Sequence, residues 1–265
     1  YIIDCSSGYC DYAGATWVPD AGSASLDNSG AITAVATGAG GTGHAYGATI
    51  LGAFGSGITN SGHISASVDA DNADAVGALA NSVFGYATLQ NSGSIGAIAS
   101  GDVASANGVF IAGAYGSADN GQLAVSVDNQ GSIQAKATGT TTATAIGLNA
   151  VGWKNDGVRI DNAGMIGAAA YGTGAIATGV LIDAHGSVVL NNTGIIGAYG
   201  DGTRIAISTA ADATATIVNA GTMTGAITTG DLDDSFDNTV GASWHAVGSS
   251  DFGGGDDHVV NHGTL

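Results

Sequence analysis

The chain has 265 residues, a formal net charge of −18 and a pI near 4.1, with only four lysines and arginines in total. A surface of this charge repels phosphate backbones and anionic lipids, so we expect no nucleic-acid partner. All 22 acidic residues are aspartates, 46 residues are glycines, and the apolar residues are mostly Ala, Val and Ile, which predicts short strands joined by tight turns.

The N-terminal segment, residues 1–21, carries the only two cysteines, Cys5 and Cys10. Gly8 between them suits a tight turn, so the segment predicts a small hairpin cap in which a Cys5–Cys10 disulfide joins the two arms. Such a bond implies an oxidising compartment, whereas two free thiols are the alternative interpretation. Residues 1–4 contain no basic residue, and we therefore expect that any signal peptide has already been removed.

Residues 22–265 contain a repeat whose first landmark is an Asn-x-Gly that recurs in phase at eight positions, with spacings of 27 to 42 residues. An aliphatic residue lies two positions before each Asn, and a second aliphatic or a Met lies two positions after each Gly. This alternation with a period of two is typical of strands with one buried face. The asparagines are Asn28, Asn60, Asn91, Asn129, Asn162, Asn192, Asn219 and Asn261.

A second landmark, Ala-x-Gly, follows the Asn by 15 to 17 residues in the first five repeats, as in Ala45-Tyr46-Gly47 and Ala145-Ile146-Gly147. Two landmarks in constant phase predict an all-β fold, a right-handed, single-stranded parallel β-helix of about eight to nine coils. Rungs about 4.8 Å apart would let each Asn amide donate to one neighbour and accept from another, as a structural ladder. An antiparallel sandwich, the alternative, needs a turn signal every 8–12 residues or so, and disorder needs no phased pattern at all.

The tail differs from the rest of the repeat, because two Asp-rich segments, residues 230–238 and 253–261, echo each other at a shorter spacing. We therefore expect shorter coils and an extra turn at Asn238. The second segment partly matches the calcium-binding nonapeptide of RTX β-rolls, which gives Asp233, Asp234, Asp256 and Asp257 as candidate calcium ligands. Because only one clean copy of the nonapeptide occurs, Asp-rich turns exposed to solvent are the favoured interpretation. We expect no other cofactor. Because residues 261–265 repeat the start of a coil, we expect the repeats to continue, or to stack on another copy, beyond Leu265.

Catalytic motifs find little support in the sequence. The six histidines are scattered, and neither a His-Glu-x-x-His nor a Gly-x-Ser-x-Gly motif occurs. A polysaccharide-acting enzyme would have to use the few basic residues, and Lys154, Asp156 and Arg159 form the one short stretch that could serve. We therefore expect no enzyme. The aromatic residues either cap the solenoid or offer a sugar- or protein-binding surface: Trp17, Trp153, Trp244, Tyr46, Tyr115, Tyr171 and Tyr199.

The combination of Leu-Asp-Asn-Ser-Gly-Ala-Ile-Thr-Ala at 26–34 with His-Ala-Tyr-Gly-Ala at 44–48 resembles the repeats of bacterial autotransporter passengers, over roughly residues 22–265. The resemblance implies a secreted or cell-surface protein, anchored through its own outer-membrane barrel. It implies attachment, aggregation or biofilm formation, with a glycan or protein of a host or neighbouring cell as partner. A self-assembling extracellular fibre, in which coil ends stack head to tail, is the alternative function, and the polysaccharide-acting enzyme is the third.

Overall fold

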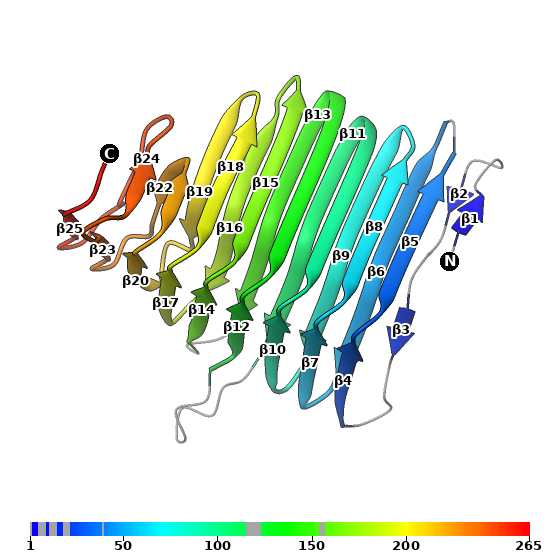
Figure 1. Ribbon diagram of the computed structural model, residues 1–265, viewed down its shortest axis with the longest axis horizontal. Coiled ribbons are helices and arrows are strands. Elements are labelled where there is room, and N and C mark those ends of the chain that lie inside the picture. The colour runs from blue at the N-terminus through cyan, green and yellow to red at the C-terminus, as the bar shows by residue number, and fades with distance from the viewer. Residues whose placement is uncertain are drawn as a thin grey trace.

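The computed structural model describes residues 22–38, 40–114, 123–153 and 157–265, together with the backbone of residues 2–4, 9–10 and 15–17. This part of the chain consists of strands and turns, and every strand pairing in it is parallel. Successive coils lie side by side along the longest axis of the molecule (Figure 1). No helix in the described residues is long and apolar enough to cross a membrane.

Each coil begins on a first face, a nine-stranded sheet in which every strand ends at an asparagine. The register keeps these asparagines opposite one another, as in Asn129↔Asn162. The strands are β4 (Ser23–Asn28), β7 (Gly55–Asn60), β10 (Tyr86–Asn91), β12 (Val125–Asn129), β14 (Val158–Asn162), β17 (Ser187–Asn192), β20 (Thr214–Asn219), β23 (Ser235–Asn238) and β25 (His258–Asn261).

The second face follows the Asn-x-Gly turn. Its isoleucines stack in one column, with Ile95 opposite both Ile64 and Ile133. The strands of this face are β1 (Ile2–Asp4), β5 (Ala31–Thr37), β8 (His63–Asp69), β11 (Ser94–Gly113), β13 (Ser132–Gly152), β15 (Met165–Gly172), β18 (Ile195–Gly200), β21 (Thr222–Thr224) and β24 (Ser243–His245).

The third face carries the Ala-x-Gly landmark and closes each coil. Strands β11 and β13, with 20 and 21 residues, run through both the second and third faces, so the two faces form one 16-stranded sheet. The remaining strands of the third face are β2 (Tyr9–Cys10), β3 (Ala15–Trp17), β6 (Thr42–Gly52), β9 (Asn72–Ser82), β16 (Ile176–Ala184), β19 (Thr203–Thr209) and β22 (Ala226–Thr228).

The interior is divided into two compartments. The aliphatic compartment lies behind the first face and contains fully buried Ile, Leu and Val side chains such as Ile133, Leu148 and Ile160. The alanine compartment lies between the far ends of the second and third faces, and it consists of alanines apart from Val68. Small side chains on both faces let the two sheets approach closely there, which produces the narrow end of the cross-section.

The glycine of the Ala-x-Gly landmark marks the line where the two compartments meet. A Cβ atom added to Gly147 would lie 2.6 Å from the carbonyl oxygen of Gly179, and 3.0 Å from both Gly167 O and the Cγ2 atom of Ile166. Both oxygens belong to backbone that cannot move without breaking a ladder. The landmark therefore records a close approach of the third face to the second, with the preceding alanine packed in the narrow compartment.

The predicted all-β parallel solenoid is confirmed, but the number of full coils is smaller than expected. Six coils in the described residues, β4 to β19, have strands of five or more residues on every face, against the eight to nine coils predicted. The tail accounts for the difference, since β21, β22 and β24 have three residues each. The right-handed sense stays a prediction.

Most of residues 1–21 lie outside the described part of the chain, so the hairpin cap stays a prediction. Strand β1 pairs with β5, and β2 and β3 both pair with β6, in parallel each time. These short strands extend the ladders of the first coil at the edges of β5 and β6. Cys5 and the side chain of Cys10 lie outside the described residues, so the disulfide stays a prediction.

Aromatic side chains fill the core where the tail coils narrow. Phe236 takes the position opposite Ile217 in the first face, and its ring meets the ring of Trp244 edge-on with centroids 5.0 Å apart. The indole nitrogen of Trp244 donates a hydrogen bond to Gly225 O at 3.0 Å, and Phe252 packs against Phe236 at 6.2 Å. Of the predicted aromatic candidates, Trp244 thus serves the core.

Candidate functional site

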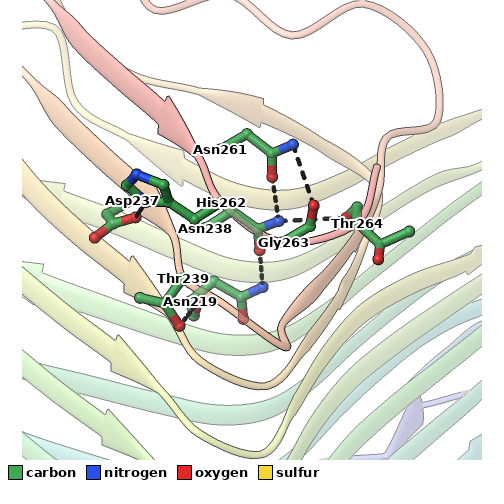
Figure 2. A network of polar contacts seen from close by, with 8 residues as sticks. All are labelled: Asn219, Asp237, Asn238, Thr239, Asn261, His262, Gly263 and Thr264. Atoms are coloured by element: carbon green, nitrogen blue, oxygen red, sulfur yellow. Dashed lines mark hydrogen bonds and ion pairs between the residues drawn. The ribbon is translucent and has the colours of Figure 1, made fainter.

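The asparagines form one continuous hydrogen-bonded column along the first face. In each of eight links the Nδ2 atom donates to the Oδ1 atom of the next asparagine towards the C-terminus, at 2.6 to 2.8 Å. Asn238 lies between Asn219 and Asn261, where the sequence led us to expect an extra coil. Figure 2 shows the last three members of the column, with His262 against Asp237 beside them.

The column is structural, since nearly all of it is buried. Asn129 is fully buried, and its amide group also approaches Gly131 O at 3.3 Å and Met165 O at 3.2 Å, so both amide hydrogens have acceptors. Only Asn261, at the last rung, is exposed. The eight predicted ladder residues are therefore brought together, and all of them except Asn261 are buried away from any ligand.

The four aspartates proposed as calcium ligands lie in two successive turns of the tail, and the carboxylates of Asp233, Asp234 and Asp257 accept hydrogen bonds from backbone amides. Asp233 Oδ1 accepts from Asp256 N at 2.8 Å, and Asp257 Oδ1 accepts from Asp234 N at 3.0 Å. Asp234 is buried; its Oδ1 accepts from Ala215 N at 2.7 Å, while its Oδ2 has no hydrogen-bond partner. Among the described residues, no group of three or more His, Cys or Asp side chains could hold a metal ion.

A groove runs along the corner where the second face turns into the third, and we call it the corner groove. It crosses five consecutive coils, has a volume of about 810 Å³, and is lined by residues 37–38, 69–71, 100–102, 138–140 and 171–172. Each coil contributes the segment in which its backbone passes from the second face to the third, and in β11 and β13 this segment is continuous strand. The alanine compartment lies directly beneath the groove. The repeat thus presents similar short segments side by side, one rung apart.

The chemistry of the corner groove is polar and acidic. Three exposed carboxylates, Asp69, Asp71 and Asp102, lie among the hydroxyl groups of Ser and Thr residues. Thr140 Oγ1 donates to Asp102 Oδ1 at 2.7 Å, which fixes that carboxylate, and Tyr171 lies at the C-terminal end of the groove. Carboxylates and hydroxyls in a row can accept hydrogen bonds from a sugar or from cationic side chains along an extended ligand.

A second, smaller hollow lies on the outer surface of the second face, and we call it the sheet trough. It has a volume of about 250 Å³ and is lined by residues 96–98, 134–136, 165, 167–169 and 199. Lys136 lies where the two hollows approach each other, with its Nζ atom 5.8 Å from the centroid of the Tyr171 ring. Tyr171 and Tyr199, both named as candidate binding aromatics, are therefore placed at neighbouring hollows.

Of the three residues considered for catalysis, only Arg159 lies in the described part of the chain. Lys154 and Asp156 lie outside the described residues. Arg159 Nε donates to Asp161 Oδ2 at 2.6 Å, and this hydrogen bond, together with the charge of Asp161, raises the pKa of Arg159. Partial burial is the largest single effect on the pKa of Asp161 and raises it, but hydrogen bonds from Arg159 and Asn191 and the Arg charge together lower it below its usual value.

The histidines remain dispersed along the described coils. His44 lies 3.3 Å from Asp74, and His185 Nδ1 lies 2.6 Å from Asp212 Oδ2, on separate surfaces. The hydrogen bond with Asp212, assisted by its charge, raises the pKa of His185 and lowers that of Asp212. Both side chains are exposed, so the pair is a surface contact rather than a buried acid–base couple.

Sequence reasoning missed both hollows, although a signal was present. Aligning the repeats column by column would have shown Asp and hydroxyl residues at equivalents of position 69 and glycines at equivalents of position 96. Searches against known protein families, curated proteins and solved structures gave no match.

Proposed function

We propose that this chain is a non-enzymatic adhesive β-solenoid, secreted or displayed on a cell surface, which attaches to a glycan or protein of a host or neighbouring cell. The observation that supports this function is the corner groove, which repeats the same kind of polar segment over five coils. An elongated row of equivalent groups suits an extended ligand held by many weak contacts. The resemblance of the repeats to autotransporter passengers points the same way.

The stacked architecture supports a mechanical role for the rest of the molecule. Each coil contacts mainly its neighbours through parallel ladders and the asparagine column, so the shape is that of a rod with repeated surfaces. A rod of this kind holds the corner groove away from its point of attachment. The acidic surface, with a net charge of −18, keeps such rods apart in solution.

The test is an attachment assay with fluorescent beads that carry the purified chain, scored on an epithelial monolayer and on a bacterial lawn. Beads coated with serum albumin, which is also acidic, serve as the background. We expect retention above that background on at least one surface. Replacing the three groove carboxylates with amides (Asp69→Asn, Asp71→Asn, Asp102→Asn) removes three exposed charge contacts, and we expect retention to fall by roughly threefold or more.

A matched triple variant, Asp27→Asn, Asp128→Asn and Asp183→Asn, removes the same charge from exposed positions outside the corner groove and should retain binding. Retention equal to albumin on both surfaces would overturn the adhesive function. Equal losses in the two triple variants would show that net charge, rather than the corner groove, drives attachment. Filaments in dilute solution, seen by electron microscopy, would favour the fibre instead.

A further inference from the structure

In the described residues, the outer surface of the second face between the Asn-x-Gly turn and the corner groove holds no aspartate, in a chain that has 22 of them. Three outward-facing columns start at residues 31, 33 and 35 of β5 and continue through β8, β11, β13, β15 and β18. None of their positions holds Asp, and the first one appears in the next column, at Asp69 in the corner groove. The sheet trough lies in the middle of this surface.

A tyrosine ring lies flat in the sheet trough. Tyr199 turns back along its own strand, so that a Cβ atom added to Gly197 would overlap the Cζ and hydroxyl end of the ring. The side chain is 37% exposed, which leaves part of the ring open to solvent. Gly96, in the same column as Gly197, has no heavy atom within 4 Å of an added Cβ position, so the trough is open there.

Lys136 gives the sheet trough its only charged side chain. Its ammonium lies over the face of Tyr171 and, among the described residues, makes no ion pair with any aspartate. Lys136 and Tyr199 occupy one column, separated by Ala169, so their Cα atoms are two rungs or about 10 Å apart. The trough therefore combines an aromatic surface, the Gln134 amide and an available positive charge.

We propose that the sheet trough binds an acidic pyranose, a uronic acid unit of a polysaccharide, with the sugar ring against Tyr199 and its carboxylate at Lys136. The C–H face of a pyranose is weakly positive and matches the negative face of a tyrosine ring. An ammonium without a carboxylate partner among the described residues, in a hollow lined by no carboxylate, complements a carboxylate on the ligand. At physiological salt, charges beyond about 8 Å are largely screened, and no aspartate lines the sheet trough itself.

This inference rests on the proposed adhesive function and names a chemical class of ligand for it. The sheet trough is separate from the corner groove, and the two can be varied independently. A second copy of the chain is the competing occupant of a surface without aspartate. The monomer mass of the protein in dilute solution, measured by light scattering, distinguishes a sugar site from that interface.

The experiment is isothermal titration calorimetry of the whole chain with hexamers of galacturonate and mannuronate, and with cellohexaose as the neutral arm. We expect at least one acidic hexamer to bind more tightly than cellohexaose. Tyr199→Ala removes the ring surface and should weaken binding about three- to tenfold. Lys136→Met keeps the chain length and should abolish the preference for the acidic hexamer, a change of about two- to fivefold.

Gly96→Val places a branched side chain in the open trough without a clash, so the protein should fold and binding should be lost. Thr33→Val, which puts the same residue in the same column two coils away, should bind as the unmodified chain does. No heat from any hexamer, unchanged affinity in Tyr199→Ala and Gly96→Val, or a dimer that Gly96→Val dissociates would each overturn the sugar site. If Gly96→Val beads attach normally, the sheet trough has no part in attachment, and the adhesive function stands. If the chain binds sugar but attaches to no cells, the adhesive function is wrong and the sugar site stands.

Discussion

The two interior compartments are built from the same coils, yet they depend on opposite properties of their side chains. The aliphatic compartment is stable because large side chains fill it, and Ile133 and Ile166 stack directly on each other. The alanine compartment is stable because its side chains are small enough for two sheets to lie against each other. Burial alone therefore does not tell which substitution a position tolerates. Strand β13 shows this within four residues, because Ala145 lies in the alanine compartment and Leu148 in the aliphatic compartment.

The largest effect is expected in the aliphatic compartment. Leu148 in β13 is fully buried, and Leu148→Ala removes apolar atoms and leaves a cavity between rigid ladders. We expect the free energy of unfolding to fall by about 2–5 kcal/mol. Urea denaturation followed by circular dichroism measures this. A loss below 1 kcal/mol or so would mean that neighbouring coils collapse into the space, contrary to a stiff compartment.

The asparagine column at the edge of the aliphatic compartment should come next. Asn162→Ala leaves the Oδ1 atom of Asn192 without its donor and the amide of Asn129 without its best acceptor, and both groups are buried. Two buried unsatisfied groups predict a loss of about 2–4 kcal/mol. Hydrogen exchange of the amides around both residues should accelerate. Asn261→Ala, the same change at the exposed rung, is the control and should cost much less; equal losses would contradict a role for burial.

The alanine compartment should respond to added rather than removed atoms. Ala145→Val inserts two methyl groups between the closely packed faces, and Gly147→Ala forces a Cβ against Gly179 O. We expect each to cost about 1–3 kcal/mol, measured by thermal unfolding. Thr144→Val, at the half-exposed residue that precedes Ala145 in the same strand, is the isosteric control. If neither substitution lowered the free energy of unfolding, the alanine compartment would have to be loosely packed.

The smallest effect concerns a surface pair outside both compartments. The pKa of His185 is raised above its usual 6.5 and that of Asp212 is lowered below its usual 3.8. Because the pKa of His185 is raised, its contribution to the free energy of unfolding is present below pH 6.5 and disappears as the pH rises through its folded pKa. The contribution of Asp212 disappears as the pH falls through its lowered pKa. An NMR titration of the imidazole should show the raised pKa, and Asp212→Asn should return it towards 6.5. An unchanged His185 titration in that variant would refute the pairing.

Much of the fold was readable because the repeats keep their phase. Asn28 and its equivalents recur with aliphatic neighbours at fixed offsets, and such a pattern is satisfied only if equivalent residues stack. The tail was read less well, since the three-residue strands β21, β22 and β24 carry too few residues for a period. Calcium binding by the tail stays a prediction: among the described residues no metal-holding group forms there, and Asp233 and Asp257 accept hydrogen bonds from backbone amides.

The sequence by itself determined the all-β class, the parallel stacking and the column of asparagines, because local periodicity and identical repeats specify the register directly. Only the tertiary structure decided that the interior has two compartments, since the width of each depends on the side chains of the opposite face. It also decided that short segments about thirty residues apart meet at one corner to form a groove. Tyr199 and Lys136 lie in one column for the same reason: the distance between them depends on the pitch of the coil rather than on their separation along the chain.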